Sequence, residues 1–318
     1  MRRAPALFVA ASLLLVTLSA CSSDPNASCA SAAHAGAASN LISVSGAVGK
    51  APNVSFPTPL KTATTQRKVI DAGTGAPIEK GQEVVMQYNI YNSTTGSLIA
   101  SSGYTASGAA GVTVGQSGLT GLDSGLLCMK QGSRIALAIS PKDGLGTNAG
   151  TYGVAPNDSL VMVVDVTKTF LPRANGTPVP STPGFPMVVL APDGTPGISV
   201  PTSAPPTALK FADLKQGSGT TVKQGDSVVV QYTGVLWKER TVFDSTWQNG
   251  QPATLVAADG SKVQGGVVPG FAKALIGQKV GSQFIVIIPP AMGYGSTGSQ
   301  TVPANSTLVF VVDVLGIQ

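Results

Sequence analysis

The chain has 318 residues, which suits two domains with connecting segments better than one small core. Only 11% of the residues are charged, while 38 are glycine and 23 are proline, so the composition excludes a protein built from long charged helices and favours a β-rich exported one. The net charge of +5 is small and spread along the chain, which argues against nucleic acid or an anionic lipid surface as a partner.

The first 20 residues have the features of an export leader. Arg2 and Arg3 precede an apolar run over residues 7–18 that is short for a membrane span, and small residues follow it. Cys21 stands at the junction, and segment 18–21 resembles a bacterial lipobox, which predicts cleavage before Cys21 and acylation of its thiol. We therefore expect an extracytoplasmic protein that meets the membrane only through a lipid anchor; an ordinary signal peptide with a cysteine nearby is the alternative.

The other two cysteines, Cys29 and Cys128, would then lie in an oxidising compartment. That compartment favours a disulfide between them over two free thiols, the alternative. His34 is the only histidine and lies in an Ala/Ser/Gly tract, so we expect a solvated side chain and no histidine-based catalysis. No cluster of ligands has metal-binding spacing, and neither a metal nor a cofactor is expected.

Two segments lack the periodicity of packed elements. Residues 21–40 contain no aromatic residue and are predicted to be a flexible tether, and residues 171–206 carry ten prolines typical of a semi-extended linker. Within the second segment the apolar run 187–190 is a candidate for docking on a neighbouring domain. The predicted order is a leader, a tether, a first domain, a linker and a second domain, with bounds 1–20, 21–40, 41–170, 171–206 and 207–318.

The two predicted domains are copies of each other. Three segments of the first recur in the same order in the second, at nearly constant offset: 75–88 as 219–232, 132–141 as 281–290, and 160–166 as 308–314.

Apolar, β-branched runs at 228–236, 284–288 and 307–315 are predicted strands, because each has strand length and is bounded by Gly or Pro. Segment 271–276 is a predicted short helix, in which Phe271 and Leu275 share one face. Each domain is therefore expected to be α+β, with an antiparallel sheet packed on one short helix.

Aromatic and polar residues in the second copy follow an order and spacing that resemble the FKBP-type peptidyl-prolyl isomerases. The resemblance covers about 207–318 and implies that each sheet is a half-barrel wrapped around its helix. It identifies eight candidate site residues: Tyr232, Phe243, Asp244, Val267, Val268, Phe271, Tyr294 and Phe310.

The resemblance also implies a role for each residue. Phe271 would form the floor of an apolar cup, with Tyr232, Phe243 and Phe310 as walls and Val267 and Val268 as the rim. The Val268 N–H and the Tyr294 hydroxyl would meet substrate carbonyls, while Asp244 would lie beside Tyr232 and polarise the cup. Two positions depart from the family pattern: a loop aromatic is replaced by Ala253 or Leu255, and the loop after Tyr294, which carries Ser299, is one residue short.

The first copy lacks most of this set. Alignment places Tyr88 with Tyr232, but aliphatic residues stand at the other positions: Ile99, Ala100, Leu119, Leu122, Leu145 and Met162. The first domain is therefore expected to keep the frame of the family and to have lost the site.

The expected function is peptidyl-prolyl isomerisation by the second domain, acting on proline-containing segments of exported proteins, with macrolides as candidate ligands. Rotation about an X-Pro bond needs no nucleophile, metal or cofactor, only a site that favours the twisted amide. A non-catalytic peptide-binding or chaperone module is the main alternative. An adhesion-type β-sandwich array is disfavoured, and so is a plain aromatic core, because neither has a use for Asp244 and Tyr294.

Overall fold

The structure, a computed structural model, describes residues 29, 30 and 32–318. The predicted leader, Cys21 and residues 22–28 of the predicted tether lie outside the described residues. Across the described range, every helix is too short or too polar to cross a bilayer.

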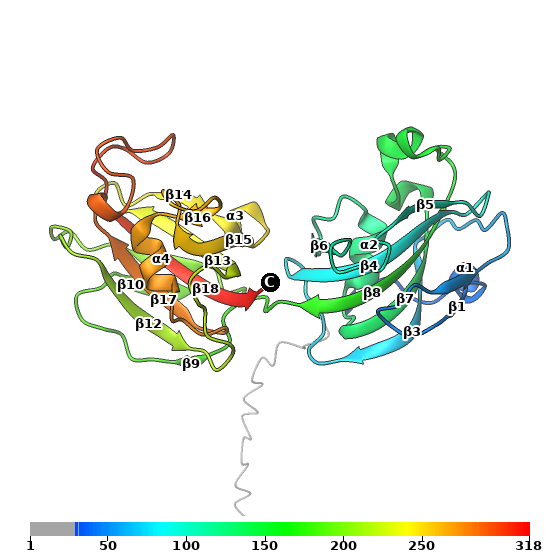
Figure 1. The fold of residues 1–318 in the computed structure, drawn as a ribbon, viewed down its shortest axis with the longest axis horizontal. Coiled ribbons are helices and arrows are strands. Elements are labelled where there is room, and N and C mark those ends of the chain that lie inside the picture. The colour runs from blue at the N-terminus through cyan, green and yellow to red at the C-terminus, as the bar shows by residue number, and fades with distance from the viewer. Residues whose placement is uncertain (1–28, 31) are drawn as a thin grey trace, which may run out of the picture.

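Two β-rich domains lie side by side in Figure 1, each with a curved sheet that carries one short helix on its inner face. The first sheet has six strands in the order β3-β7-β8-β4-β5, and β6 also pairs with β4. The helix α2 (Thr120–Leu126) packs against β7. The strands are β3 (Gln66–Thr74), β4 (Glu83–Asn92), β5 (Leu98–Ser101), β6 (Ala110–Thr113), β7 (Gln131–Ile139) and β8 (Leu160–Thr169).

The second sheet has eight strands in the order β16-β15-β13-β18-β17-β12-β9, with β14 paired to β13. All of its pairs are antiparallel except β15 with β16. This confirms the predicted α+β class with two domains of one kind. The elements are β9 (Thr177–Pro178), β12 (Lys210–Gln216), β13 (Ser227–Leu236), β14 (Val242–Ser245), α3 (Thr246–Asn249), β15 (Ala253–Asp259), β16 (Gly266–Val267), α4 (Pro269–Leu275), β17 (Gln283–Ile288) and β18 (Leu308–Ile317), and short 3-10 turns join others.

The long central strands of each sheet are largely apolar because both faces of the sheet are covered. In β18, Phe310 and Val312 pack with helix α4, whereas Val309 and Val311 belong to a second core on the opposite face. Side chains alternate between the faces of a strand, so a strand buried on both sides is mostly apolar, and its buried carboxylates, such as Asp165 and Asp313, are hydrogen-bonded.

The second core includes residues of the predicted linker, so the prediction of a semi-extended spacer is wrong, whereas the docking expected for the run 187–190 is observed. Residues 187–199 fold into a hairpin of β10 (Met187–Leu190) and β11 (Pro196–Ser199), whose Val188 and Ile198 pack against the outer face of the sheet. Strand β9 joins the sheet edge beside β12. The prolines suggested an extended spacer, but Pro178 ends strand β9 and Pro196 begins strand β11, and the second domain begins well before residue 207.

The first domain also has a two-stranded hairpin packed on the outer face of its sheet. Strands β1 (Ser43–Ser45) and β2 (Asn53–Ser55) pair Val44 with Val54, which is the register of Val188 with Ile198 shifted by 144 positions. Their core includes Ala136, Ala138 and Val161 on the outer face of the first sheet. The repeated unit is therefore the hairpin together with the half-barrel.

The predicted tether is also wrong for its described part. Ala32, Ala33 and Ala38 are buried, α1 (Ala37–Asn40) packs against β3 and β7, and Cys29 is joined to Cys128 by a disulfide. The low-complexity composition hid this packing, because small alanine side chains fit closely against a covered sheet. His34 is exposed, as expected.

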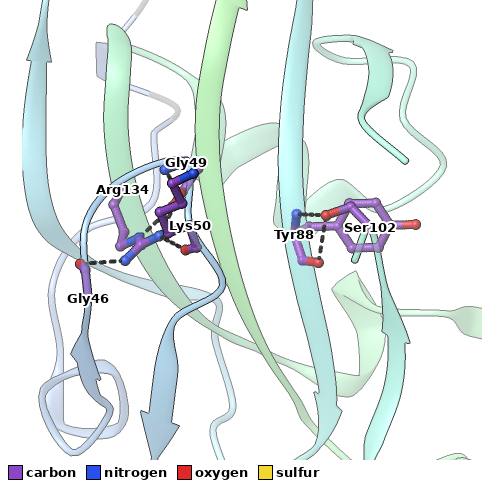
Figure 2. A network of polar contacts seen from close by, with 7 residues as sticks. Gly46, Gly49, Lys50, Tyr88, Ser102 and Arg134 are labelled. Atoms are coloured by element: carbon purple, nitrogen blue, oxygen red, sulfur yellow. Dashed lines mark hydrogen bonds and ion pairs between the residues drawn. The ribbon is translucent and has the colours of Figure 1, made fainter. Parts of the chain in front are cut away.

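A buried ion pair holds the covering hairpin of the first domain (Figure 2). The Arg134 guanidinium binds Asp165 at 2.5 Å and donates to the carbonyl oxygens of Gly46 and Lys50, both at 2.7 Å. The Asp165 carboxylate also accepts the Gly49 N–H at 2.6 Å. Because every charge has a partner, the attraction and the hydrogen bonds can offset the large desolvation penalty of burying the pair.

The two domains share a small apolar core where β18 ends between them (Figure 1). Phe170, which follows β8, is 2% exposed and packs with Val229 and Leu315 of the second domain. The Leu171 N–H donates to the Leu315 carbonyl at 3.1 Å. An ion pair between Arg173 and Glu79 lies at the rim, but both side chains are about 40% exposed, so it adds little.

Candidate active site

A pocket of about 500 Å³ opens on the inner side of the second sheet. Strands β13, β14, β15 and β18, helix α4 and the loop before β18 contribute to its wall. All eight residues predicted from the sequence line it, and the structure adds seven more: Leu255, Asp259, Gly260, Ser261, Gly266, Pro269 and Gly293. Leu255, rather than Ala253, therefore stands where the family loop aromatic was expected.

Four aromatic rings form one edge-to-face cluster in the pocket. The Phe310 ring centroid lies 5.1 Å from that of Phe271, 5.4 Å from that of Phe243 and 5.8 Å from that of Tyr232. Each pair is tilted by at least 72°, the arrangement in which a ring edge meets a ring face favourably. Phe271 and Phe310 are almost wholly buried, so they fix the floor and back of the cup.

Asp244 and Tyr232 form the polar side of the cup. The Tyr232 hydroxyl donates to the Asp244 carboxylate at 2.5 Å. The Tyr232 backbone is bound at both its N–H and its carbonyl by the Thr246 hydroxyl, at 2.8 and 3.2 Å, which ties strand β13 to the start of helix α3. Burial, and then the bond to Asp244, raise the pKa of Tyr232, so the phenol stays protonated at neutral pH.

Tyr294 and Val268 present free donors at the mouth. Tyr294 is 38% exposed, and burial followed by the Asp244 charge raises its pKa, so its hydroxyl keeps its proton at neutral pH. Val268 precedes α4 and accepts the Phe271 N–H at 2.9 Å. Within the described part of the chain its own N–H has no hydrogen-bond partner.

Gly234 is a pocket determinant that sequence reasoning missed. A Cβ at this position would lie 2.7 Å from the Phe310 ring and 2.8 Å from the Phe243 ring. Only glycine lets both rings close over strand β13. The signal in the sequence was available, since a glycine inside a strand often marks a close approach, and this one lies two residues after Tyr232.

The first domain keeps the frame and fills the cup. Ala100 pairs with Ile90 in the register in which Asp244 pairs with Gly234, so the aspartate is lost and an isoleucine side chain occupies the place of the glycine. Met162 and Leu122 replace Phe310 and Phe271 and are buried. This agrees with the prediction that the first domain has lost the site residues.

One polar feature of the frame is retained in the first domain (Figure 2). The Ser102 hydroxyl binds the N–H and carbonyl of Tyr88, at 2.9 and 3.3 Å, just as Thr246 binds Tyr232. The tyrosine is therefore anchored in both domains, but only the second domain places a carboxylate against its hydroxyl.

Comparison with known proteins agrees with the duplicated frame. Residues 75–167 and 218–315, together more than half of the chain, match the family model described as FKBP-type peptidyl-prolyl cis-trans isomerase.

Individual relatives match only one part of the chain. An Aeromonas hydrophila protein named FKBP-type peptidyl-prolyl cis-trans isomerase FkpA is 36% identical over 112 residues, which are 35% of this chain and 39% of that protein. A Corynebacterium glutamicum protein named probable FK506-binding protein is 32% identical over 120 residues, which are 38% of this chain and 96% of that protein.

Among solved structures, the three FKBP domains of wheat FKBP73 align with 80% of this chain and 94% of theirs, at 24% identity and a TM-score of 0.36. The chain spans about two fifths of the length of the FkpA relatives that it matches. Both halves match one family model, and the chain therefore belongs to the FKBP-type peptidyl-prolyl cis-trans isomerase family.

Proposed function

We propose that the second domain catalyses cis-trans isomerisation of X-Pro peptide bonds. The observation that supports this most is the pocket of about 500 Å³ in which four aromatic rings, Asp244 and Tyr294 converge. A proline ring fits an apolar aromatic cup, and the flanking carbonyls need only a few donors at its edge.

The physical basis of catalysis is preferential binding of the twisted amide. The barrier to X-Pro rotation is ~18–20 kcal/mol because the planar amide is conjugated. An apolar cup withdraws water from the carbonyl, which favours the less polar twisted form. A thousandfold acceleration needs only about 4 kcal/mol, which desolvation and one or two hydrogen bonds can supply.

Each site residue then has a definite task. Phe271 and Phe310 hold the proline ring, Phe243 and Tyr232 exclude water from its sides, and Val267 forms the rim. The Val268 N–H and the Tyr294 hydroxyl donate to substrate carbonyls. Asp244 accepts from Tyr232 and directs its negative potential towards the rotating amide.

A protease-free isomerisation assay on the full chain, with a Leu-Pro or Phe-Pro peptide, tests this function. We expect a rate proportional to enzyme concentration and suppressed by a macrolide that occupies the same cup. A folded chain that binds the peptide without accelerating isomerisation would favour the non-catalytic peptide-binding alternative.

The proposed setting is the outer face of a bacterial membrane, where the protein would assist folding of exported proteins. The leader-like residues 1–20, the lipobox-like segment 18–21 and the Cys29–Cys128 disulfide support this. Slow X-Pro isomerisation limits folding wherever a native isomer must be selected.

Cys21→Ala tests the anchor, because two acyl chains hold a protein stably at a membrane. The variant should be released or left unprocessed. Mass spectrometry that finds a cleaved but unmodified Cys21 in membrane-bound wild-type protein would contradict the anchor.

A further inference from the structure

The active pocket carries negative charge on a chain whose net charge is positive. Its lining includes the two carboxylates Asp244 and Asp259 and contains no lysine, arginine or histidine. The whole chain has a net charge of +5. The negative charge of the pocket would attract a basic residue next to a bound proline and repel an acidic one.

The two carboxylates differ in what they face. Asp244 lies inside the cup and accepts the Tyr232 hydroxyl. Asp259 lies at the end of β15, where the wall of the pocket turns outward, and its side chain is 25% exposed. Asp259 is therefore the carboxylate that a side chain entering with the substrate can reach.

A tight turn holds Asp259 in place. Its Oδ1 accepts the Ser261 N–H at 3.0 Å and the Ser261 hydroxyl at 2.8 Å, and its carbonyl accepts the N–H groups of Lys262 and Val263. The Gly260 N–H is bound to the Val267 carbonyl at 2.8 Å, which ties the turn to the rim of the cup. The hydrogen bonds from Ser261 lower the pKa of Asp259, so the group is ionised at neutral pH.

No nearby cation neutralises this carboxylate strongly. Lys262 approaches Asp259 only to 3.9 Å, and its side chain is 78% exposed, so the pair is loose and screened by solvent. A guanidinium or ammonium group on a substrate could replace it at little cost.

We infer that Asp259 is a specificity-determining residue that favours substrates with arginine or lysine next to the proline. This inference rests on the proposed isomerase function and adds the charge of the preferred substrate to it. Exposed charge pairs have modest energies, so we expect a preference of about three- to fivefold for a basic over an acidic neighbour at low salt.

The test compares kcat/KM of the full chain for matched peptides that carry Arg or Glu before the proline, and for a second pair that carries them after it. At least one Arg/Glu ratio should reach about threefold and fall towards one at about 0.5 M salt, where charges on this scale are screened. Asp259→Asn should bring that ratio close to one, and Asp259→Lys should invert it. Asp259→Glu should retain it.

Asp226→Asn is the matched control. Asp226 is also a turn aspartate of the second domain, accepting the Lys223 N–H at 2.8 Å, but it does not line the pocket. This variant removes the same charge and should keep the Arg/Glu ratio of the wild type.

Wild-type ratios of one for both pairs, or a ratio that survives Asp259→Asn, would overturn the inference while leaving the isomerase function intact. A folded chain without activity on any of the peptides would contradict the function itself.

Discussion

The two domains share one frame and differ at the pocket. Both have a covering hairpin in the same register, a sheet buried on both faces and a tyrosine whose backbone is bound by a hydroxyl. Besides the aromatic residues of the cup, they differ at three positions, where Gly234, Asp244 and Tyr294 of the second domain correspond to Ile90, Ala100 and Leu145 of the first. The frame can therefore persist without the pocket.

This difference shows what the pocket demands of the fold. The second domain leaves a cavity beside buried aromatic rings and keeps a carboxylate next to it, both of which cost stability. The first domain fills the same space with aliphatic side chains. We interpret the first domain as a stable support and the second as the working site.

The largest expected effect concerns the disulfide, which only the first domain has. The disulfide joins two cysteines with a sequence separation of 99. Replacing both Cys29 and Cys128 by alanine increases the conformational entropy of the unfolded chain, and the chain-entropy model gives a loss of about 4–5 kcal/mol in the stability of the first domain. Trp237 and Trp247 are the only tryptophans, and both lie in the second domain. Trp247 also lines a hollow with Glu79 and Gln116 of the first domain, so the comparison uses a Trp247→Phe background, in which Trp237 in the outer core of the second domain gives the signal.

Urea unfolding followed by circular dichroism should therefore show an earlier transition, while the fluorescence transition shifts much less. An equal shift in both signals would mean that the shared core at Phe170 makes the domains unfold as one unit.

Filling the second cup should abolish most activity. Gly234→Ile places a branched side chain where even a Cβ would lie 2.7 Å from the Phe310 ring, so we expect at least about a hundredfold loss in kcat/KM, equivalent to about 2.7 kcal/mol. The reciprocal Ile90→Gly should destabilise the first domain and leave kcat/KM unchanged. Near wild-type activity in a folded Gly234→Ile variant would contradict this description of the cup.

Removing the carboxylate should have an intermediate effect. Asp244→Ala deprives the Tyr232 hydroxyl of its partner and should lower kcat/KM about tenfold, or about 1.4 kcal/mol. If the two residues act as a unit, Tyr232→Phe combined with Asp244→Ala should be little worse than either change alone. Fully additive losses would show that they act independently.

The smallest effect is expected at Tyr294. Tyr294→Phe removes one partly exposed hydroxyl and should reduce kcat/KM about threefold without altering thermal stability. Leu145→Tyr in the first domain, added to an otherwise inactivated chain, should restore no activity, because Ile90 and Met162 still fill that cup. A gain of activity there would show that a single donor decides catalysis.

The sequence predicted the site better than the boundaries of the domains. Seven of the eight site residues lie in or next to strands or helix α4, which apolar patterning predicts. Tyr294 lies in the loop before β18, and only the family resemblance placed it at the pocket. Gly234 escaped notice because its importance is the absence of a side chain, which is visible only once the two rings are placed.

The covering segments were mispredicted for a different reason. The hairpin of residues 187–199 has two four-residue strands among prolines and glycines, and such short alternation is indistinguishable from a linker. Asp259 and Ser261 also could not be predicted, since a turn shows no periodicity and only its attachment to Val267 brings it to the pocket.

The most direct test of the account gives the second domain the pocket residues of the first. The full chain carrying Gly234→Ile, Asp244→Ala and Tyr294→Leu should fold, as shown by unchanged tryptophan fluorescence, and should isomerise an X-Pro peptide no faster than the uncatalysed rate. Substantial remaining isomerase activity in that folded variant would place catalysis outside the second pocket and contradict the account.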